Sequence, residues 1–385
     1  MRYIVSINLF FVCLFSYSQN FQISKIVVDI NTKKPLESVI IFNENDYSTT
    51  NADGKFVFVS QNNEVNLSLL GYDKIKTSFE KLKNTKDTIF MQMKDNQLQE
   101  VVVNSASSYM KKVFDRMKDN YLQNYTVNFF LRSTLQKDTV TIVLQDIYAK
   151  KNRNTNKEQN TSVEILNMRK ISLFVKKENM SYKFPGFNDF FTTAIPEIDK
   201  CSFTEVSFND QDFKKIEFQT KEKNSWGQIW SGYFIINRKD YAIVEYNLIA
   251  ISDPDDVPYK SILLRNGQYR TVKWNKLVQY SKDIASNKYY LSSSKFENSL
   301  EAKVDQKTIY YDYNMNYFVT NSPTNEKVRS NFSIEEDVFK AKFSYSKDFW
   351  DHQNQLPLTK ELEGFLKSVL EKKEKKKEYE VIGNF

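Results

Sequence analysis

The sequence predicts a mainly β protein: a small N-terminal β-sandwich, a short linking helix, and a large antiparallel β-domain with a C-terminal helix. The first observation behind this prediction is the aromatic content. Aromatic residues make up 15% of the 385 residues, with 30 Phe and 23 Tyr, and such rings pack well on pleated sheets. The second is that short alternating apolar runs, separated by turn residues, recur along the chain. The length suits about two or three domains.

Residues 1–18 are predicted to form a signal peptide. Arg2 precedes an apolar run, and Ser16-Tyr17-Ser18 supplies the small residues of a cleavage site, so we expect the mature chain to begin at Gln19. The run is shorter than the ~20 residues that a membrane-spanning helix needs. The alternatives are an uncleaved anchor helix and a lipidated Cys13. The sequence therefore predicts an exported protein with no transmembrane helix in the mature chain.

Residue counts limit the chemistry of the chain. The single histidine is His352, which excludes a zinc site built from several histidines and leaves one candidate base for a Ser-His or Cys-His mechanism. Signal cleavage would remove Cys13 and leave Cys201, which we expect to be a buried structural residue rather than a reactive thiol. The net charge of +7 is small for this length, and acidic residues interleave with the lysines. We therefore expect no cofactor, no metal and no nucleic-acid partner.

Residues 19–103 are predicted to form the N-terminal sandwich. Strands are expected at residues 23–30, 39–42, 55–59, 65–69 and 88–93. Thr50–Phe56 has the pattern T-x-x-D-G-x-F, Leu67–Tyr72 ends a strand with Gly-Tyr, and Leu98–Val103 has the pattern L-x-E-V-V-V. In these patterns the segment resembles the carboxypeptidase-regulatory-like domain, a transthyretin-type sandwich common in exported proteins of Gram-negative bacteria. The resemblance implies a non-catalytic structural or docking role.

Residues 104–124 are predicted to form the linking helix. Its apolar stripe consists of Met110, Val113, Phe114, Met117 and Tyr121. The following strands contain Phe130-Leu131-Arg132 and Asp146-Ile147-Tyr148, and the chain later contains Phe349–Gln353 and Pro357–Thr359. This order partly resembles a larger envelope family in which a regulatory-like domain precedes a helix and strands that end in F-Y-R and E-x-x-x-x-Y. The resemblance implies export and leaves the biochemistry unassigned.

Residues 125–385 are predicted to form the antiparallel β-domain. Paired strands are expected at 126–132 and 139–148, 230–236 and 241–246, and 261–264 and 269–274, with further strands at 288–291 and 308–311. Residues 150–162 are predicted to form a polar loop, and a helix with Leu362, Phe365, Leu366, Val369 and Leu370 on one face is expected to start near Thr359. The pattern around Gly232–Asn237 and Ala242–Tyr246 resembles the curved half-barrel of periplasmic lipoprotein carriers, which implies a lipid-sized cavity.

Five residues are candidate ligand or partner contacts. Trp226, Trp230 and Tyr233 suggest an aromatic stripe that could stack on sugars, with core packing as the alternative. Trp350 and His352 lie in the one segment whose side chains could perform acid–base chemistry. The alternative is that His352 is a hydrogen-bonded packing residue.

Two charged segments are further candidate contact sites. Asp253–Asp256 could hold Ca²⁺ but lacks the spacing of a calcium loop, which favours a polar turn. Glu371–Glu378 mixes basic and acidic residues, which favours an exposed helix end over a contact with anionic lipid or glycan.

We expect a non-catalytic exported protein, in the periplasm or on the periplasmic face of the outer membrane, that binds or scaffolds an envelope protein, lipid or glycan. The alternative is a periplasmic carrier or sensor of a lipid or other apolar ligand held in a curved sheet. A third hypothesis is a hydrolase that uses paired carboxylates. An apolar pocket between the sheet and the C-terminal helix would favour the carrier, whereas a filled core would favour the scaffold. Two carboxylates that face each other in a cleft would favour the enzyme.

Overall fold

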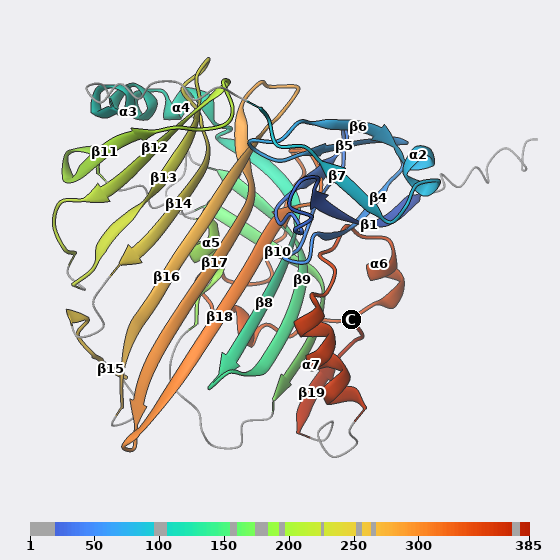
Figure 1. Ribbon diagram of the computed structural model, residues 1–385. Coiled ribbons are helices and arrows are strands. Elements are labelled where there is room, and N and C mark those ends of the chain that lie inside the picture. The colour runs from blue at the N-terminus through green and yellow to red at the C-terminus, as the bar shows by residue number, and fades with distance from the viewer. Residues whose placement is uncertain are drawn as a thin grey trace, which may run out of the picture.

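The computed structural model describes residues 20–95, 106–154, 160–173, 184–191, 197–224, 227–251, 256–262, 267–371 and 378–385. Two small N-terminal sheets precede a few short helices and a 12-stranded sheet in which every paired strand is antiparallel (Figure 1). The predicted mainly β fold class is confirmed. The predicted signal peptide and the closing pattern at Leu98–Val103 lie outside the described residues.

The N-terminal sandwich consists of two small sheets that share one core. One sheet has the order β4-β1-β7 and the other β3-β2-β5-β6. The strands are β1 (Phe21–Asp29), β2 (Ile40–Phe42), β3 (Tyr47–Thr49), β4 (Lys55–Ser60), β5 (Glu64–Ser68), β6 (Ile75–Ser78) and β7 (Thr88–Met91). Val27, Ile41, Phe56 and Leu67 meet in the core, and helix α2 (Phe79–Lys83) adds Phe79. Sequence analysis missed β3, β6 and α2, which are short and contain few apolar residues.

Gly54 explains why the turn before β4 needs glycine. Its φ is +72°, a backbone conformation that side chains with a Cβ rarely adopt. A Cβ at this position would also lie 2.4 Å from the Val27 carbonyl oxygen, too close for any side chain. The predicted Asp53-Gly54 turn therefore brings β4 against β1, where the two strands pair.

The linker is two helices rather than the single predicted helix. Helix α3 (Ala106–Asp115) and helix α4 (Met117–Asn120) are separated at Arg116. Met110 and Val113 are buried as predicted, but Tyr121 lies beyond the helix end in extended conformation. The Tyr121 hydroxyl donates a 2.7 Å hydrogen bond to the Ile243 carbonyl oxygen, which ties the linker to the large sheet.

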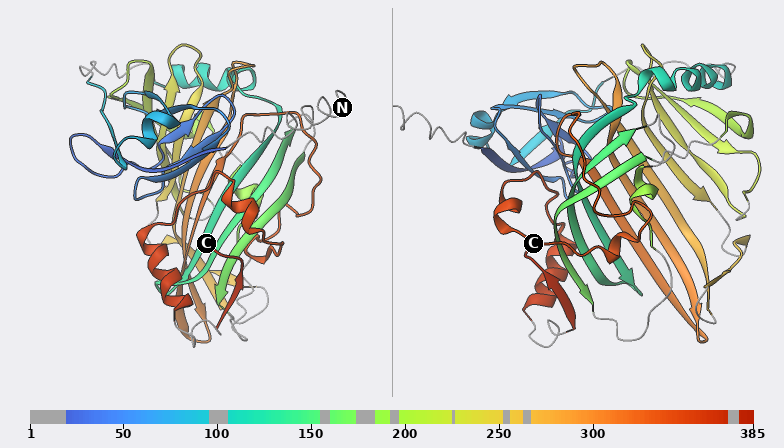
Figure 2. Two further views of the ribbon diagram at one scale, coloured as in Figure 1. Left: turned by 90° about the vertical axis from the view of Figure 1, so that its right-hand side faces the viewer. Right: turned by 180° about the vertical axis from the view of Figure 1, so that it is seen from behind.

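The large sheet joins two separate runs of the chain. Its strands are β8 (Asn124–Lys137), β9 (Val140–Asn154), β10 (Asn160–Leu173), β11 (Cys201–Val206), β12 (Phe213–Thr220), β13 (Ile229–Asn237), β14 (Ile243–Ile251), β15 (Lys260–Ile262), β16 (Gly267–Lys282), β17 (Tyr289–Val304), β18 (Lys307–Val319) and β19 (Tyr379–Ile382). β11 to β18 follow chain order apart from β15, which pairs with β16, and β18 then pairs with β8, followed by β9, β10 and β19. β11 and β19 are the two ends of the sheet, which is open and curved (Figures 1 and 2).

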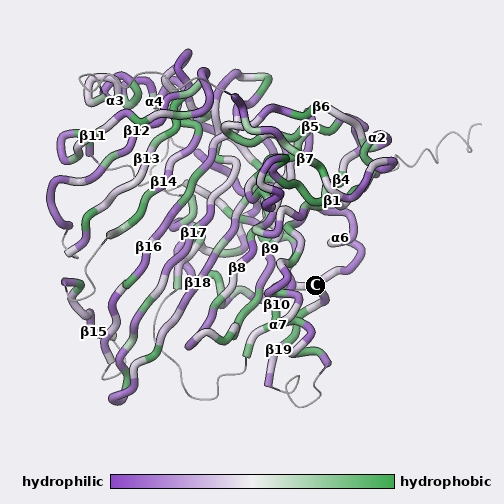
Figure 3. The backbone as a smooth tube through the Cα atoms, in the orientation of Figure 1, coloured by the Kyte–Doolittle hydropathy of each residue, from purple (hydrophilic) through white to green (hydrophobic). Residues whose placement is uncertain are grey.

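The two faces of this sheet have different coverings. Alternate residues of β8, such as Phe129 and Leu131, point to what we call the core face, which packs against helix α5 (Phe187–Phe191) and the short helix η4 (Val338–Lys340). Phe130 and Arg132 point to the opposite face, which we call the docking face. The sandwich and the C-terminal helices lie on this side (Figure 2), and hydrophobic and hydrophilic residues alternate along the long strands (Figure 3).

The prediction of a loop at residues 150–162 is wrong at both ends of this range. β9 continues to Asn154 and β10 begins at Asn160, so the hairpin extends into the polar segment. Lys151 turns its side chain to the core face, while Lys150 forms a 2.6 Å ion pair with Glu326. Strand pairing with β8 satisfies the backbone here although the sequence lacks apolar alternation.

The C-terminal segment contains helix α6 (Lys347–Asp351), helix α7 (Lys360–Leu370) and β19. Helix α7 starts near Thr359 as predicted, and the Thr359 side chain caps it. Leu362 and Val369 are buried, whereas Leu370 is 42% exposed. Sequence analysis missed β19, which pairs with β10 after the helix, and residues 372–377 of the predicted charged helix end lie outside the described residues. Among the described residues, no helix combines the length and apolar character that crossing a membrane requires.

Candidate functional site

Residues 354–363, which we call the C-terminal strap, hold the sandwich on the docking face. The Asn354 side chain accepts a 2.7 Å hydrogen bond from the Val59 backbone N–H and donates a 3.0 Å bond to the Val59 carbonyl oxygen. Asn51 donates to the carbonyl oxygens of Pro357 and Leu358, at 3.2 and 3.3 Å. Each of these contacts joins a side-chain amide of one part to a backbone group of the other.

A buried charge cluster fixes the other side of the strap. Asp146 accepts hydrogen bonds from Arg132 on β8 and from Arg169 on β10, with the closest at 2.7 Å to each. Burial alone would raise the pKa of Asp146, but the two guanidinium groups hold it below its ordinary value. Arg132 also donates a 2.7 Å bond to the Pro357 carbonyl oxygen, and Arg169 donates to Gln355.

Trp350 belongs to this cluster and is a packing residue. It is 2% exposed, its ring lies 4.5 Å from the Arg169 guanidinium, and it meets Phe130 and Tyr148 edge to face. The motif residues Arg132, Asp146 and Tyr148, which suggested a family resemblance, thus meet the Trp350 segment in one buried assembly. Their position indicates a structural role for Trp350.

His352 lies at the surface, two residues beyond Trp350. Its side chain is 54% exposed, and its Nδ1 lies 2.7 Å from the Asp348 carbonyl oxygen at the end of α6. It lines a cavity of about 310 Å³ between the sandwich, the large sheet and α6, which we call the amide cavity. Most of its lining residues carry side-chain amides, namely Asn20, Asn45, Gln61, Asn62, Asn128, Asn321, Gln353 and Asn354. These residues form no local motif, so the sequence alone gives no signal for them.

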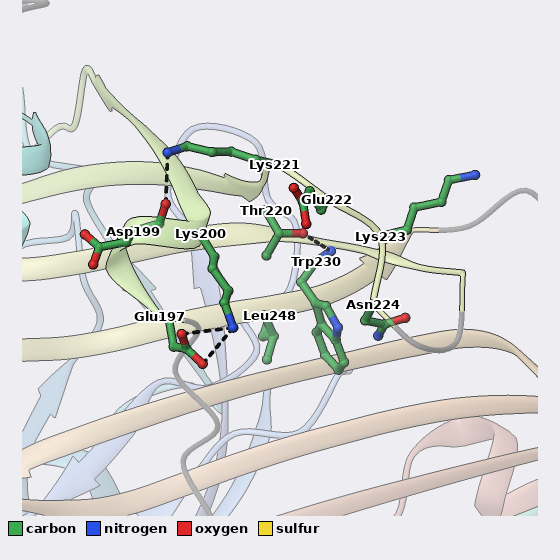
Figure 4. A pocket seen from close by; sticks show the side chains of 10 residues that line it. All are labelled: Glu197, Asp199, Lys200, Thr220, Lys221, Glu222, Lys223, Asn224, Trp230 and Leu248. Carbon is green, nitrogen blue, oxygen red and sulfur yellow. Dashed lines mark hydrogen bonds and ion pairs between the residues drawn. The ribbon is translucent and has the colours of Figure 1, made fainter.

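Trp230 lies in a different place, the pocket of about 600 Å³ drawn in Figure 4, which we call the Trp230 pocket. Trp230 and Leu248 form its apolar floor, and the Trp230 ring packs edge to face on Trp274 with centroids 4.7 Å apart. Charged side chains of both signs surround this floor, and Lys200 pairs with Glu197 at 3.0 Å (Figure 4). The positive and negative charges at the rim of the Trp230 pocket therefore largely cancel each other.

Trp230 and Tyr233 do not form one aromatic stripe. They are three positions apart on β13, so the alternation of a strand sends them to opposite faces. Tyr233 points to the docking side, where its hydroxyl donates a 2.9 Å hydrogen bond to Glu245. Trp226 and Asp253–Asp255 lie outside the described residues, and Asp256 forms a 2.6 Å ion pair with Lys223.

The cleft between the docking face and α7 is lined by polar and apolar surface in similar amounts. It measures about 250 Å³, and Arg132, Lys295 and Glu297 are among its lining residues. Lys295 lies between two carboxylates, 3.0 Å from Glu37 and 3.4 Å from Glu297. Charged groups therefore stand among the apolar ones in this cleft, and the Lys295 ammonium group separates the carboxylates of Glu37 and Glu297.

The fold and these cavities define a mainly β protein in which a small sandwich is held on a large sheet, with polar cavities at the junction. No family model and no curated protein matches the sequence. Among solved structures, a chain of the Pseudomonas aeruginosa MucA/MucB complex is similar, with 6% sequence identity and a TM-score of 0.16. The match covers 55% of this chain and 93% of that chain. Similarity at this level carries no argument about function.

Proposed function

We propose that this is a non-catalytic exported protein of the cell envelope, which binds an envelope partner at the junction between its sandwich and its large sheet. The observation that supports this most is the C-terminal strap. Asn354 bonds to the sandwich while Pro357 accepts from Arg132 of the sheet, so the two parts form one body. A cavity with fixed walls at such a junction needs little ordering when a partner binds.

Packing beside α5 supports a binding or scaffolding role over an apolar carrier. There Phe187, Phe190 and Phe191 of α5 cover the core face, which is open only at the Trp230 pocket among the cavities described above. The cleft beside α7, where a carrier would hold its ligand, is lined by Arg132, Lys295 and other polar groups. The predicted signal peptide supports export to the periplasm or to the periplasmic face of the outer membrane.

Retention of a partner from envelope extract tests this function. The mature chain is immobilised and compared with a variant that carries Gln61→Arg and Gln353→Arg, which place two bulky cations at the mouth of the amide cavity. We expect the wild type to retain an envelope component that this variant loses. The control, Glu222→Arg at the rim of the Trp230 pocket, should retain it. Equal retention by all three chains, or no retention, would contradict the proposal.

The Trp230 pocket favours one second candidate, a carrier of an amphipathic ligand. Its floor of Trp230 and Leu248 is apolar, and its volume of about 600 Å³ suits a ligand of drug size. The fluorescent probe N-phenyl-1-naphthylamine tests this function. A carrier should bind it with saturation, Trp230→Ala should abolish binding, and Tyr310→Ala, which removes an exposed aromatic ring elsewhere, should not. Equal fluorescence from both variants would contradict the carrier function.

A further inference from the structure

The amide cavity presents hydrogen-bonding groups that the protein itself does not use. Gln61 follows β4 of the sandwich, Asn128 lies on β8, and Gln353 follows α6, so three separate parts of the chain contribute. Within the described part of the chain, the side-chain amides of these three residues have no hydrogen-bond partner. Each offers two N–H donors and one carbonyl acceptor to whatever enters the cavity.

The walls that carry these amides are fixed. Asn321 accepts a 2.7 Å hydrogen bond from the Asn128 backbone N–H, which requires that its oxygen, and not its nitrogen, faces that strand. The Asn321 Nδ2 group is therefore left as a further donor. Deeper in the cavity, the hydroxyls of Tyr148 and Thr320 are 2.7 Å apart and bonded to each other. The site is thus a preformed set of neutral donors and acceptors.

The charge of the cavity favours a neutral ligand. No lysine or arginine is among the described residues that line it, and Asp46 is the only acid. Asp46 accepts a 2.6 Å hydrogen bond from the Ser60 hydroxyl, and burial raises the pKa of this carboxyl. An anionic ligand would find no lysine or arginine to pair with among the described lining residues. An apolar ligand would take water away from the amides and leave them without hydrogen bonds.

Asn354 argues against an extended peptide as the ligand. Strand β4 is an edge strand of its small sheet and pairs only with β1 there. A peptide could add to its open edge through backbone hydrogen bonds. At Val59, however, both the N–H and the carbonyl oxygen are already bonded to the Asn354 side chain, at 2.7 and 3.0 Å. The edge beside the cavity is therefore closed to strand addition.

We infer that the amide cavity binds a neutral glycan, a mono- or disaccharide unit at a time. Sugar hydroxyls both donate and accept hydrogen bonds, as the side-chain amides of Gln61, Asn128 and Gln353 do. The volume of about 310 Å³ lies at the lower end of the range of small-ligand sites, about 300–1,000 Å³. This inference rests on the proposed function and adds the chemical class of the partner.

Calorimetric titration of the mature chain with maltotriose, mannotriose and triacetylchitotriose tests the inference. We expect saturable binding of at least one of these glycans, weakened at least tenfold by Asn128→Leu and by Gln61→Ala. The control, Gln136→Leu, lies on the same strand β8 but outside the cavity, where its side chain contacts Glu361, and should bind as the wild type does. Gln61 is exposed, so its variant tests the site even if Asn128→Leu fails to fold.

Several outcomes would overturn the inference. These are no binding of any of the three glycans, equal binding by the Asn128→Leu and Gln136→Leu variants, and binding of penta-alanine in place of the glycans. Partner retention from envelope extract is measured on the same preparation. If the chain retains a partner but binds no glycan, the glycan inference alone fails. If it does neither, the proposed function fails as well.

Discussion

Arg132 and Asp146 lie opposite each other on the adjacent strands β8 and β9, and Arg132 donates a hydrogen bond of 2.7 Å to each carboxylate oxygen. Both side chains are buried, and Arg132 also donates a hydrogen bond to the Pro357 carbonyl oxygen of the C-terminal strap. This strand pair anchors the strap. The sandwich also contacts the large sheet directly, because the Tyr47 N–H donates to the Thr320 carbonyl oxygen and Glu37 pairs with Lys295.

Asp146→Asn should strongly destabilise the fold. The substitution leaves the guanidinium groups of Arg132 and Arg169 buried without a counter-charge, and breaking a buried pair in this way costs about 3–5 kcal/mol. Urea unfolding followed by circular dichroism measures the change. Asp348→Asn, at a carboxyl that is 93% exposed, is the control and should change stability little. Equal stabilities of the two variants would contradict a central role for the cluster.

The same carboxyl predicts how stability depends on pH. The pKa of Asp146 is lower in the folded than in the unfolded state, where it is near 3.8. Its contribution to stability is therefore complete above pH 3.8 and is lost as the pH falls through the lowered folded-state pKa. The free energy of unfolding of the wild type should fall over that acidic range, and the fall should be smaller in Asp146→Asn. Identical acid profiles would contradict this assignment.

Lys151→Met should stabilise the protein. Lys151 is 1% exposed, its Nζ lies 4.1 Å from the centre of the Phe191 ring and 5.0 Å from that of Tyr317, and it makes no hydrogen bond or ion pair with the described residues. Burial, and then the charge of Arg153, lowers the pKa of Lys151 well below 10.5. Replacing a buried charged group that has aromatic contacts but no hydrogen-bond or ion-pair partner in the described structure by an apolar one should gain roughly 1–3 kcal/mol.

The pH dependence of Lys151 checks the same interpretation. Because its pKa is lowered in the folded state, the lysine destabilises the fold fully below that pKa, and the penalty fades as the pH rises toward 10.5. Stability gained by Lys151→Met should therefore shrink at alkaline pH. Lys170→Met is the matched control, since the Lys170 Nζ donates to the Phe339 carbonyl oxygen, and it should destabilise. A loss of stability in Lys151→Met would contradict the prediction.

Asn354→Leu should loosen the strap from the sandwich. It removes both hydrogen bonds to Val59 and leaves a buried backbone N–H and carbonyl oxygen unpaired, at a cost of about 1–3 kcal/mol for each group. Hydrogen exchange at the Val59 amide should accelerate. Gln353→Ala, one position earlier and without a side-chain hydrogen bond in the described structure, should leave this exchange rate unchanged. Slow exchange in both variants would show that the strap is held by other contacts.

Part of the site could have been found from sequence and was not. Trp230 and Tyr233 are an odd number of positions apart in a predicted strand, and alternation alone puts them on opposite faces. No comparable signal marks the amide cavity. Gln61, Asn128 and Gln353 are isolated polar residues, and isolated polar residues usually lie on a solvated surface.

Periodicity and turn chemistry among near neighbours predict the mainly β class, most strands of the sandwich, and the helix that begins after Thr359. The pairing of β18 with β8, the contact of Asp146 with two arginines, and the position of the strap across the sandwich arise only in the folded chain. These contacts join residues up to about 300 positions apart, and their energy comes from burial and hydrogen bonding that exist only once the sheet has formed.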